Sequence, residues 1–192
     1  MLDNSKIVTY EEDYFLHGNA FGGYEGYSDF PVHADRVKKI IDIANPKSVL
    51  DVGCAYGYIV HRFLDLGIHA IGMDISEWCE KQAQKIIPDH FIRHDVRQRL
   101  PFKYKEFDVL YCEGVLEHIE TEYIGDIMRE FERVSNKRIL ALSFDYHPNA
   151  KETAGHLCLK DHNWWFAMMP YHTWLFLGNT AIEGGNQWFY KG

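Results

Sequence analysis

The chain lacks most of the features that would place it in a membrane, in a secretory route or around a structural metal. No apolar run approaches the ~18 residues that cross a bilayer, and the polar, acidic stretch 1–13 has no apolar core of a signal peptide. Its 192 residues include four cysteines, with no C-x-x-C pair and no zinc-ligand spacing. We therefore expect a cytoplasmic protein without membrane contact, whose cysteines are free and buried.

An excess of positive charge is also missing. The chain has 20 Lys and Arg against 28 Asp and Glu, which gives a formal net charge of -8. Nucleic-acid surfaces need clustered basic side chains, and the basic residues here are scattered. The densest basic set is interleaved with acids and comprises Arg93, Arg97, Arg99, Lys103 and Lys105. We expect a small-molecule substrate and no nucleic-acid partner, and we make no prediction of the oligomeric state.

Two common phosphate-binding motifs are absent, and a different glycine pattern is present. No G-x-x-x-x-G-K-[ST] run occurs, and in a G-x-G-x-x-G alignment only Gly53 fits, because Ala55 and Tyr58 occupy the other glycine positions. The run 49–58 instead predicts a strand ending in an acid, a loop with Gly53 and Gly57, and the start of a helix. In an α/β sheet this order opens a nucleotide-sized crevice at the carboxyl end of the strand.

Strand and helix patterns alternate along most of the chain, which favours βαβ units and a mostly parallel sheet. The segment 10–30 combines seven aromatic residues with glycines and no regular period, so we expect 1–30 to be an aromatic lid on a single domain, 31–192. The expected helices cover 31–44, 58–66, 76–87, 121–134 and 161–169. The expected strands cover 48–52, 69–75, 90–94, 107–112, 138–144, 173–177 and 187–191.

Two of these helices have an apolar face that can be read from the spacing. In the helix that begins at Pro31, the expected face comprises Ala34, Val37, Ile41 and Ala44. Thr121 is expected to cap the later helix. The expected face of that helix comprises Ile124, Ile127, Met128, Phe131 and Val134.

Acidic residues recur where four successive predicted strands end. Asp51, Asp74, Asp95 and Glu113 follow one another at about one βα unit apart. A parallel sheet brings the carboxyl ends of its strands to one edge, so four carboxylates would line one crevice. Such a crevice suits a ligand with several hydrogen-bond donors and positive charge, such as S-adenosylmethionine.

The glycine loop resembles motif I, [D/E]-x-G-x-G-x-G, of the class I S-adenosylmethionine-dependent methyltransferases. Asp51, Gly53 and Gly57 match it, and Ala55 stands at the middle glycine. The run 107–119, FDVLYCEGVLEHI, closely resembles motif IV of the same family with its following V-L-E-H-[IL]. Over about 30–145 this resemblance implies a Rossmann-like, doubly wound α/β fold. Its seven-stranded sheet would be mostly parallel, with the last strand reversed and helices on both faces.

The resemblance also implies a set of cofactor-binding residues. In the family the acid after the second strand holds both ribose hydroxyls, which fits Asp74, and the acid after the third takes the adenine amino group, which fits Asp95. Ile75 and Val96 would sandwich the adenine ring. The full expected set is Tyr24, Tyr27, Asp51, Gly53, Cys54, Ala55, Gly57, Tyr58, Asp74, Ile75, Asp95, Val96 and Glu113.

The expected catalytic residues are His118 and His156, either of which could act as a general base because imidazole titrates near neutral pH. Around His156, the sequence G-H-L followed by Trp164 and Trp165 resembles methyltransferases of carbohydrate and natural-product pathways. Small-RNA 2′-O-methyltransferases hold magnesium with E-x-x-E-H, but Gly114 stands three residues before Glu117 here. We therefore expect no metal.

The combined hypothesis is methyl transfer from S-adenosylmethionine to a small-molecule acceptor, with a sugar or natural-product intermediate as the expected class. Two alternatives stay open. The chain could be a non-catalytic S-adenosylmethionine-binding module of a larger complex, or an RNA 2′-O-methyltransferase. The acceptor atom and the need for a base are not predicted.

Overall fold

The structure is a computed structural model that describes residues 10–18, 23–142, 155–158, 160, 164–165, 167, 174–179 and 187–191. Within these ranges no helix has both the length and the apolar character to cross a membrane. All four cysteines fall in the described part and are buried and unpaired with one another, as the sequence predicts. Of the predicted helix 161–169, only three residues lie in the described ranges, and they are helical: Trp164, Trp165 and Ala167.

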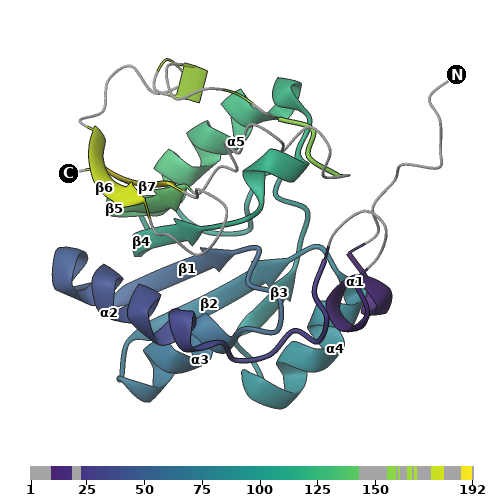
Figure 1. The fold of residues 1–192 in the computed structure, drawn as a ribbon. Helices are drawn as coiled ribbons and strands as arrows, with labels where there is room; N and C mark the ends of the chain where they lie inside the picture. Colours follow the sequence, from purple (N-terminus) through teal and green to yellow (C-terminus); the bar gives the residue numbers. More distant parts are fainter. Residues whose placement is uncertain are drawn as a thin grey trace, which may run out of the picture.

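A central sheet organises the fold (Figure 1). Its strands are β1 (Ser48–Val52), β2 (His69–Asp74), β3 (Phe91–Arg93), β4 (Phe107–Cys112), β5 (Ser135–Leu142), β6 (Trp174–Asn179) and β7 (Gln187–Lys191). The order is β3-β2-β1-β4-β5-β7-β6, with the first five strands parallel and with β7 antiparallel to both β5 and β6. From β1 the strand order runs outward to β2 and β3 on one side and from β4 to β5 on the other, so a crevice is expected at the carboxyl ends of β1 and β4.

Helices cover both faces of the sheet, as Figure 1 shows. The elements are α1 (Glu12–Leu16), α2 (Pro31–Ala44), α3 (Tyr58–Asp65), α4 (Glu77–Ile86), the short 3₁₀ helix η2 (Leu116–His118) and α5 (Thr121–Val134). Helices α2, α3 and α4 pack on one face around one apolar cluster, and α5 packs on the other around a second cluster.

Side-chain alternation along β1 separates these two clusters. Val49 points to the α2–α4 side, whereas Leu50 and Val52 point to the α5 side, and all three are fully or almost fully buried. A parallel strand covered on both faces is expected to be apolar throughout, which is why Asp51 stands out as a buried charge. Its position directs attention to the carboxyl end of β1.

The predicted Rossmann-like α/β fold with a parallel sheet is confirmed for the five strands β1–β5. The strands β1 and β4 begin and end where the sequence predicts, and the five expected apolar residues of α5 are all buried. The strand expected at 138–144 begins earlier, at Ser135, and residues 143 and 144 lie outside the described ranges.

Three local predictions differ from the structure. The stretch 10–30 contains the helix α1, whose first turn carries acids that suit a helix N-terminus and whose Phe15 is buried. On α2 the expected Val37 is buried and Ile41 and Ala44 pack against the same cluster, but Ala34 is exposed. His33, whose ring is held by Asp29 at 3.1 Å, and Ile40 complete the buried stripe. Thr121 is the first helical residue of α5 and not its cap, since extended backbone at Glu120 precedes the helix.

Candidate functional site

The loop 53–57 joins β1 to α3 at the carboxyl edge of the sheet and needs its glycines. Gly53 and Gly57 have φ of +78° and +83°. A Cβ on Gly53 would lie 2.1 Å from Cγ2 of Val115, and a Cβ on Gly57 would lie 2.3 Å from Cδ1 of Ile87. Ala55, at φ +49°, takes the same left-handed region that glycine usually fills. The loop is therefore a close-packed turn and not a loose connection.

Asp74, the last residue of β2, ties this loop to the neighbouring strand. One of its carboxylate oxygens accepts the N–H of Ala55 and the other accepts the N–H of Ser76, both at 3.0 Å. Burial raises the pKa of the Asp74 carboxyl, while hydrogen bonds from three backbone N–H groups oppose the shift. A carboxylate has about four lone-pair sites, so at least one remains for a ligand hydroxyl beside the three backbone donors. The backbone thus holds the Asp74 carboxylate in one orientation at the carboxyl edge of the sheet.

Asp51 and Glu113 lie at the ends of β1 and β4, close enough to influence each other. Asp51 is 2% exposed, and burial, followed by the charges of Glu113 and Asp74, raises its pKa well above the ordinary value. Glu113 forms an ion pair with Arg36 of α2 and accepts a hydrogen bond from the Tyr111 hydroxyl. Burial raises the pKa of Glu113, and Arg36 opposes the shift. A positively charged ligand would stabilise the ionised form of these acids.

The side chain of Arg36 is a functional candidate that the sequence interpretation missed. It lies three residues after His33 and four before Ile40, both of which are buried. An arginine at that helical spacing faces the interior and needs an acidic partner. The helical spacing of Arg36 from His33 and Ile40 could have identified it, had these two residues been included in the buried stripe of α2.

Asp95 does not present a free carboxylate. Its two oxygens receive Nε and Nη2 of Arg97 at 3.0 and 2.7 Å, and one also accepts the Arg97 backbone N–H at 2.9 Å. Burial would raise the pKa of Asp95, but the hydrogen bonds from Arg97 outweigh it and lower the pKa. A ligand at this position must share the carboxylate with Arg97. Of the two residues expected to enclose the adenine, Ile75 is 49% exposed, and Val96 is half-buried against the α5-side core.

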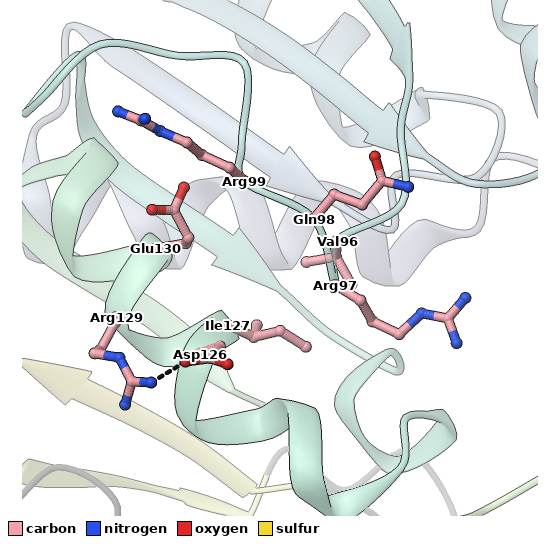
Figure 2. Close-up of a pocket in the computed structure, with 8 residues that line it drawn as sticks. All are labelled: Val96, Arg97, Gln98, Arg99, Asp126, Ile127, Arg129 and Glu130. Carbon is pink, nitrogen blue, oxygen red and sulfur yellow. Dashed lines mark hydrogen bonds and ion pairs between the residues drawn. The ribbon is translucent and has the colours of Figure 1, made fainter.

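A pocket of about 330 Å³ adjoins Val96 (Figure 2). It lies between the loop after β3 and helix α5. Its lining comprises Val96, Arg97, Gln98, Arg99, Asp126, Ile127, Arg129 and Glu130. The lining carries three arginines and two acids, a formal charge of +1 on an acidic chain, and it lies beside the adenine position expected from the sequence.

The aromatic residues of the N-terminal segment pack onto the loop 53–57. Tyr27 contacts Tyr56 edge to face, with ring centroids 4.9 Å apart, and contacts Tyr24 at 4.8 Å. The Tyr56 hydroxyl accepts a hydrogen bond from Trp78 Nε1 at 2.7 Å, and the Tyr58 ring lies 5.9 Å from Tyr27. Tyr24 is 39% exposed and Tyr27 is half-buried. Tyr56 is a further contact that the sequence interpretation did not single out.

The same segment also crosses the edge of the sheet. The Glu11 carboxylate accepts the backbone N–H of Trp78 at 2.9 Å and so caps the start of α4. Next to it, the Tyr10 ring lies 5.3 Å from His118. Burial, followed by the charge of Glu117, raises the pKa of the Tyr10 hydroxyl. Residues 10–11 therefore connect the α4 end of the edge to the histidine end.

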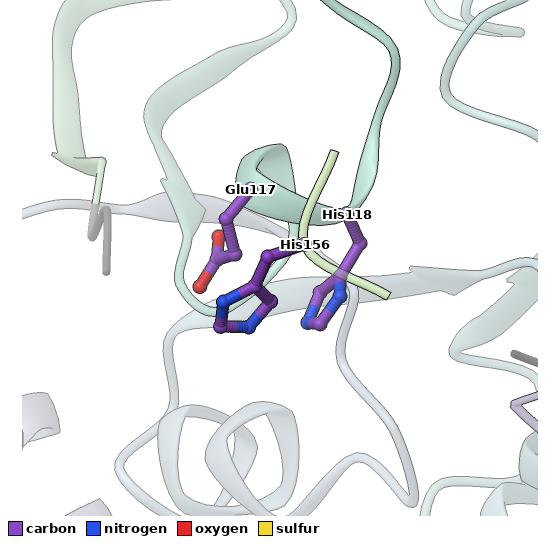
Figure 3. A group of neighbouring side chains, drawn as sticks. All are labelled: Glu117, His118 and His156. Carbon is purple, nitrogen blue, oxygen red and sulfur yellow. The ribbon is translucent and has the colours of Figure 1, made fainter. Parts of the chain in front are cut away.

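Glu117, His118 and His156 come together at that far end (Figure 3). One ligand-type atom from each lies within 4.8 Å of the other two, and the two imidazole rings are 4.7 Å apart. Glu117 is 4% exposed, while the two histidines are half-buried. The structure thus brings together both histidines expected from the sequence, and it adds a buried carboxylate beside them.

Comparison with known sequences identifies one domain. Residues 49–138 match the family model described as "Methyltransferase domain". The tRNA U34 carboxymethyltransferase of Nautilia profundicola is 38% identical over 89 residues, which cover 43% of this chain and 29% of that protein. The protein of the same name from Shewanella sp. is 35% identical over 92 residues, covering 44% and 27%. This chain therefore spans less than a third of the length of these curated relatives.

Solved structures share the fold. A SAM-dependent methyltransferase from Archaeoglobus fulgidus aligns with a TM-score of 0.68 at 16% identity, covering 88% of this chain and 94% of that one. Magnesium protoporphyrin IX methyltransferase from Synechocystis PCC 6803 with bound SAM aligns with a TM-score of 0.62 at 20% identity, covering 83% and 77%. At these identities the likeness shows the fold.

The relatives correct one expectation from the sequence. The net charge of -8 led to a small-molecule substrate and no nucleic-acid partner, but the curated relatives are named for a tRNA. That prediction is wrong, because net charge averages over the whole surface and says little about a local site. The pocket beside Val96, lined by three arginines and two acids, is such a local departure from the average.

Proposed function

We propose, on the premise that this chain carries a class I S-adenosylmethionine-dependent methyltransferase domain, that it transfers the cofactor's methyl group to an RNA acceptor. The domain is that of an enzyme, and S-adenosylmethionine is its cofactor. The acceptor is the proposed part. The observation that carries the function is Asp74, which holds the loop 53–57 at the carboxyl edge of the sheet.

The cofactor would lie along this edge. Asp74 would accept both ribose hydroxyls, and Ile75 and Val96 would enclose the adenine, with Asp95 shared between its amino group and Arg97. The turn would pass close to the methionine part, and its residues are Gly53, Cys54, Ala55, Gly57 and Tyr58. Asp51 and Glu113 would balance the positive charges of the ammonium and sulfonium groups. Burial raises the pKa of both carboxyls, and the charges of Glu113 and Asp74 add to the shift at Asp51, so a bound cation would stabilise their ionised forms.

The reaction is a direct displacement. A lone pair of the acceptor attacks the methyl carbon, the carbon–sulfur bond breaks, and its electron pair stays on sulfur to give S-adenosylhomocysteine. Alignment of two bound reactants can contribute about 7–11 kcal/mol. Where the acceptor must lose a proton, His118 or His156 would accept it, and Glu117 lies close enough to orient them.

Segment 1–30 would act as a lid over the bound cofactor. The packing of Tyr24 and Tyr27 near Tyr56, and the contact of Tyr10 with His118, support this role. The proposal also includes a complete sheet of seven strands with the last strand reversed, and a cytoplasmic location for the protein. The free, buried cysteines support the cytoplasmic location.

An RNA acceptor is supported by the names of the curated relatives and by charge near the edge. Arg97, Arg99 and Arg129 line the pocket of Figure 2, beside Val96. Arg97 pairs with Asp95, and Arg129 pairs with Asp126. Phosphate groups of a bound RNA would compete with these two acids for the arginines.

The test is transfer of labelled methyl from S-adenosylmethionine to purified tRNA by the isolated chain. Label should remain with the RNA and be released by ribonuclease. His156→Gln should reduce transfer by about 10²–10⁴-fold while S-adenosylhomocysteine affinity stays unchanged. His61→Gln, on the outer side of α3, serves as the control. Absence of ribonuclease-sensitive label from tRNA and from total RNA would contradict the proposed acceptor.

A further inference from the structure

We propose that Glu117, His118 and His156 bind one divalent transition-metal ion of the Zn²⁺, Co²⁺ or Mn²⁺ class. Each residue offers one ligand atom, and these atoms lie within 4.8 Å of one another. Nitrogen and oxygen ligands sit about 2.0–2.2 Å from Zn²⁺, so two ligands of one ion are roughly 3–4 Å apart. From a separation of 4.8 Å, a pair needs to close by about 1–2 Å to match that geometry.

The three side chains are already directed toward one another by backbone contacts. Gly155 O lies 3.0 Å from Nδ1 of His118, so that nitrogen carries the proton and Nε2 keeps its lone pair. Metal-binding histidines are oriented in this way, by a hydrogen bond from the ring nitrogen that does not bind the ion. Figure 3 shows the Glu117 carboxylate and both imidazole rings directed to the same side of η2.

A second set of hydrogen bonds fixes the position of His156. The backbone N–H groups of Leu157 and Cys158 both donate to the Glu117 carbonyl, at 2.7 and 3.0 Å. Residues 155–158 therefore lie directly against η2, although they are nearly forty positions away in the sequence. Because the backbone does this positioning, removing one ligand side chain leaves the other two in place.

The donor set selects the kind of ion. Two imidazoles and one carboxylate suit zinc and other first-row transition ions, whereas Mg²⁺ prefers oxygen ligands alone. Three protein ligands leave at least one coordination position for another group, as in catalytic and not structural sites. The surroundings are negative as well, since the charges of Glu117, Asp74 and Glu120 all raise the pKa of nearby Tyr10.

The role of the ion rests on the proposed function, although its binding does not. The open position lies at the acceptor end of the edge, where it would take an oxygen of the acceptor. A bound divalent cation lowers the pKa of such an oxygen and fixes its direction. The site therefore favours a hydroxyl acceptor over an amine.

The experiment is calorimetric titration of ZnCl₂ or CoCl₂ into tag-free, chelator-treated protein. We expect one ion per chain. Glu117→Gln and His156→Gln should each weaken binding by at least 10- to 100-fold, the range seen when even supporting residues of metal sites are removed. His61→Gln is the matched control: His61 also lies beside a carboxylate, with Asp65 at 3.2 Å, but among the described residues no third ligand group joins them. That variant should bind the ion as the unmodified chain does.

The same samples are titrated with S-adenosylhomocysteine to separate this proposal from the proposed function. Retained S-adenosylhomocysteine binding with no ion binding by the unmodified chain overturns the metal site alone. Ion binding that is equal in the Glu117→Gln, His156→Gln and His61→Gln proteins overturns it as well. Loss of ion binding in the first two variants, with their S-adenosylhomocysteine affinity and melting curves intact, supports it. Stoichiometric ion binding without methyl transfer to RNA contradicts the proposed function and leaves the site standing.

Discussion

The two ends of the carboxyl edge are built in different ways. At the cofactor end, Asp74 and the loop 53–57 hold each other through backbone N–H groups from short, neighbouring segments. At the histidine end, side chains from distant parts of the chain meet: Tyr10, Glu117, His118 and His156. The family match, 49–138, includes the whole cofactor end but excludes Tyr10 and His156. Glu117 and His118 lie inside the matched segment, so the histidine end combines residues of the domain with residues from outside it, and its geometry depends on how distant segments pack.

The largest expected effect concerns Asp74. Asp74→Ala removes a carboxylate that would receive two ribose hydroxyls, each charged hydrogen bond contributing about 1.5–3 kcal/mol. We expect S-adenosylhomocysteine to bind at least ~100-fold more weakly, as measured by calorimetry. Asp42→Ala, which removes an exposed carboxylate paired with Lys38, is the control and should leave affinity unchanged. Affinities within threefold for the two variants would place the ribose elsewhere.

The next effect tests whether the loop 53–57 is as tightly built as its geometry indicates. Gly57→Ala combines the cost of a left-handed backbone, about 1–2 kcal/mol, with overpacking of about 1–3 kcal/mol against buried Ile87. Gly67→Ala has a similar φ of +74° but meets no atom within 4 Å, so it bears the first cost alone. Thermal unfolding should show a clearly larger loss of stability for Gly57→Ala. Equal losses would mean that Ile87 yields and that the loop is loosely packed.

A smaller loss of cofactor affinity is expected at Asp95, because its carboxylate already forms an ion pair with Arg97. Asp95→Ala should weaken S-adenosylhomocysteine binding by about tenfold, equivalent to ~1.4 kcal/mol. Asp95→Asn should do less, since the amide keeps one acceptor oxygen. Calorimetry on both variants checks the order. Two negligible effects would remove Asp95 from the adenine site.

The smallest effect is a pH dependence of cofactor binding. Burial raises the pKa of Asp51, Asp74 and Glu113, so the stability that these groups contribute is present below their ordinary pKa of about 4 and is lost as pH rises through their folded values. S-adenosylmethionine carries positive charge and favours the ionised acids. Its affinity should therefore rise by a few-fold as pH increases above their ordinary pKa of about 4 and these acids ionise, as followed by the ligand-induced shift in melting temperature. A stabilisation that shrinks as pH rises would contradict this linkage.

The sequence predicted the cofactor end better than the histidine end. Asp51, Gly53, Gly57 and Asp74 lie within one βα unit of each other, where strand ends and left-handed glycines follow from local pattern. The pairing of Asp95 with Arg97 depends on side-chain rotamers, which no spacing rule fixes. Interactions between distant segments were missed, because they depend on how the layers pack.

Two examples show this limit. The ion pair between Arg36 and Glu113 joins α2 to the end of β4, and the sequence interpretation left His33 and Ile40 out of the buried stripe of α2. His156 was predicted as an alternative to His118, and the structure places them together with Glu117 because residues 155–158 fold back onto η2. The prediction that no metal binds was drawn from spacing alone, which cannot register a ligand from such a distant segment.

The measurement that tests the account most directly is a crystal structure of the chain with S-adenosylhomocysteine. We predict ribose hydroxyls within hydrogen-bond distance of Asp74, and the sulfur directed toward Glu117, His118 and His156, with an acceptor-sized space between them. A ribose bound away from Asp74, or a sulfur that faces away from the two histidines, would contradict the division of this edge into a cofactor end and an acceptor end.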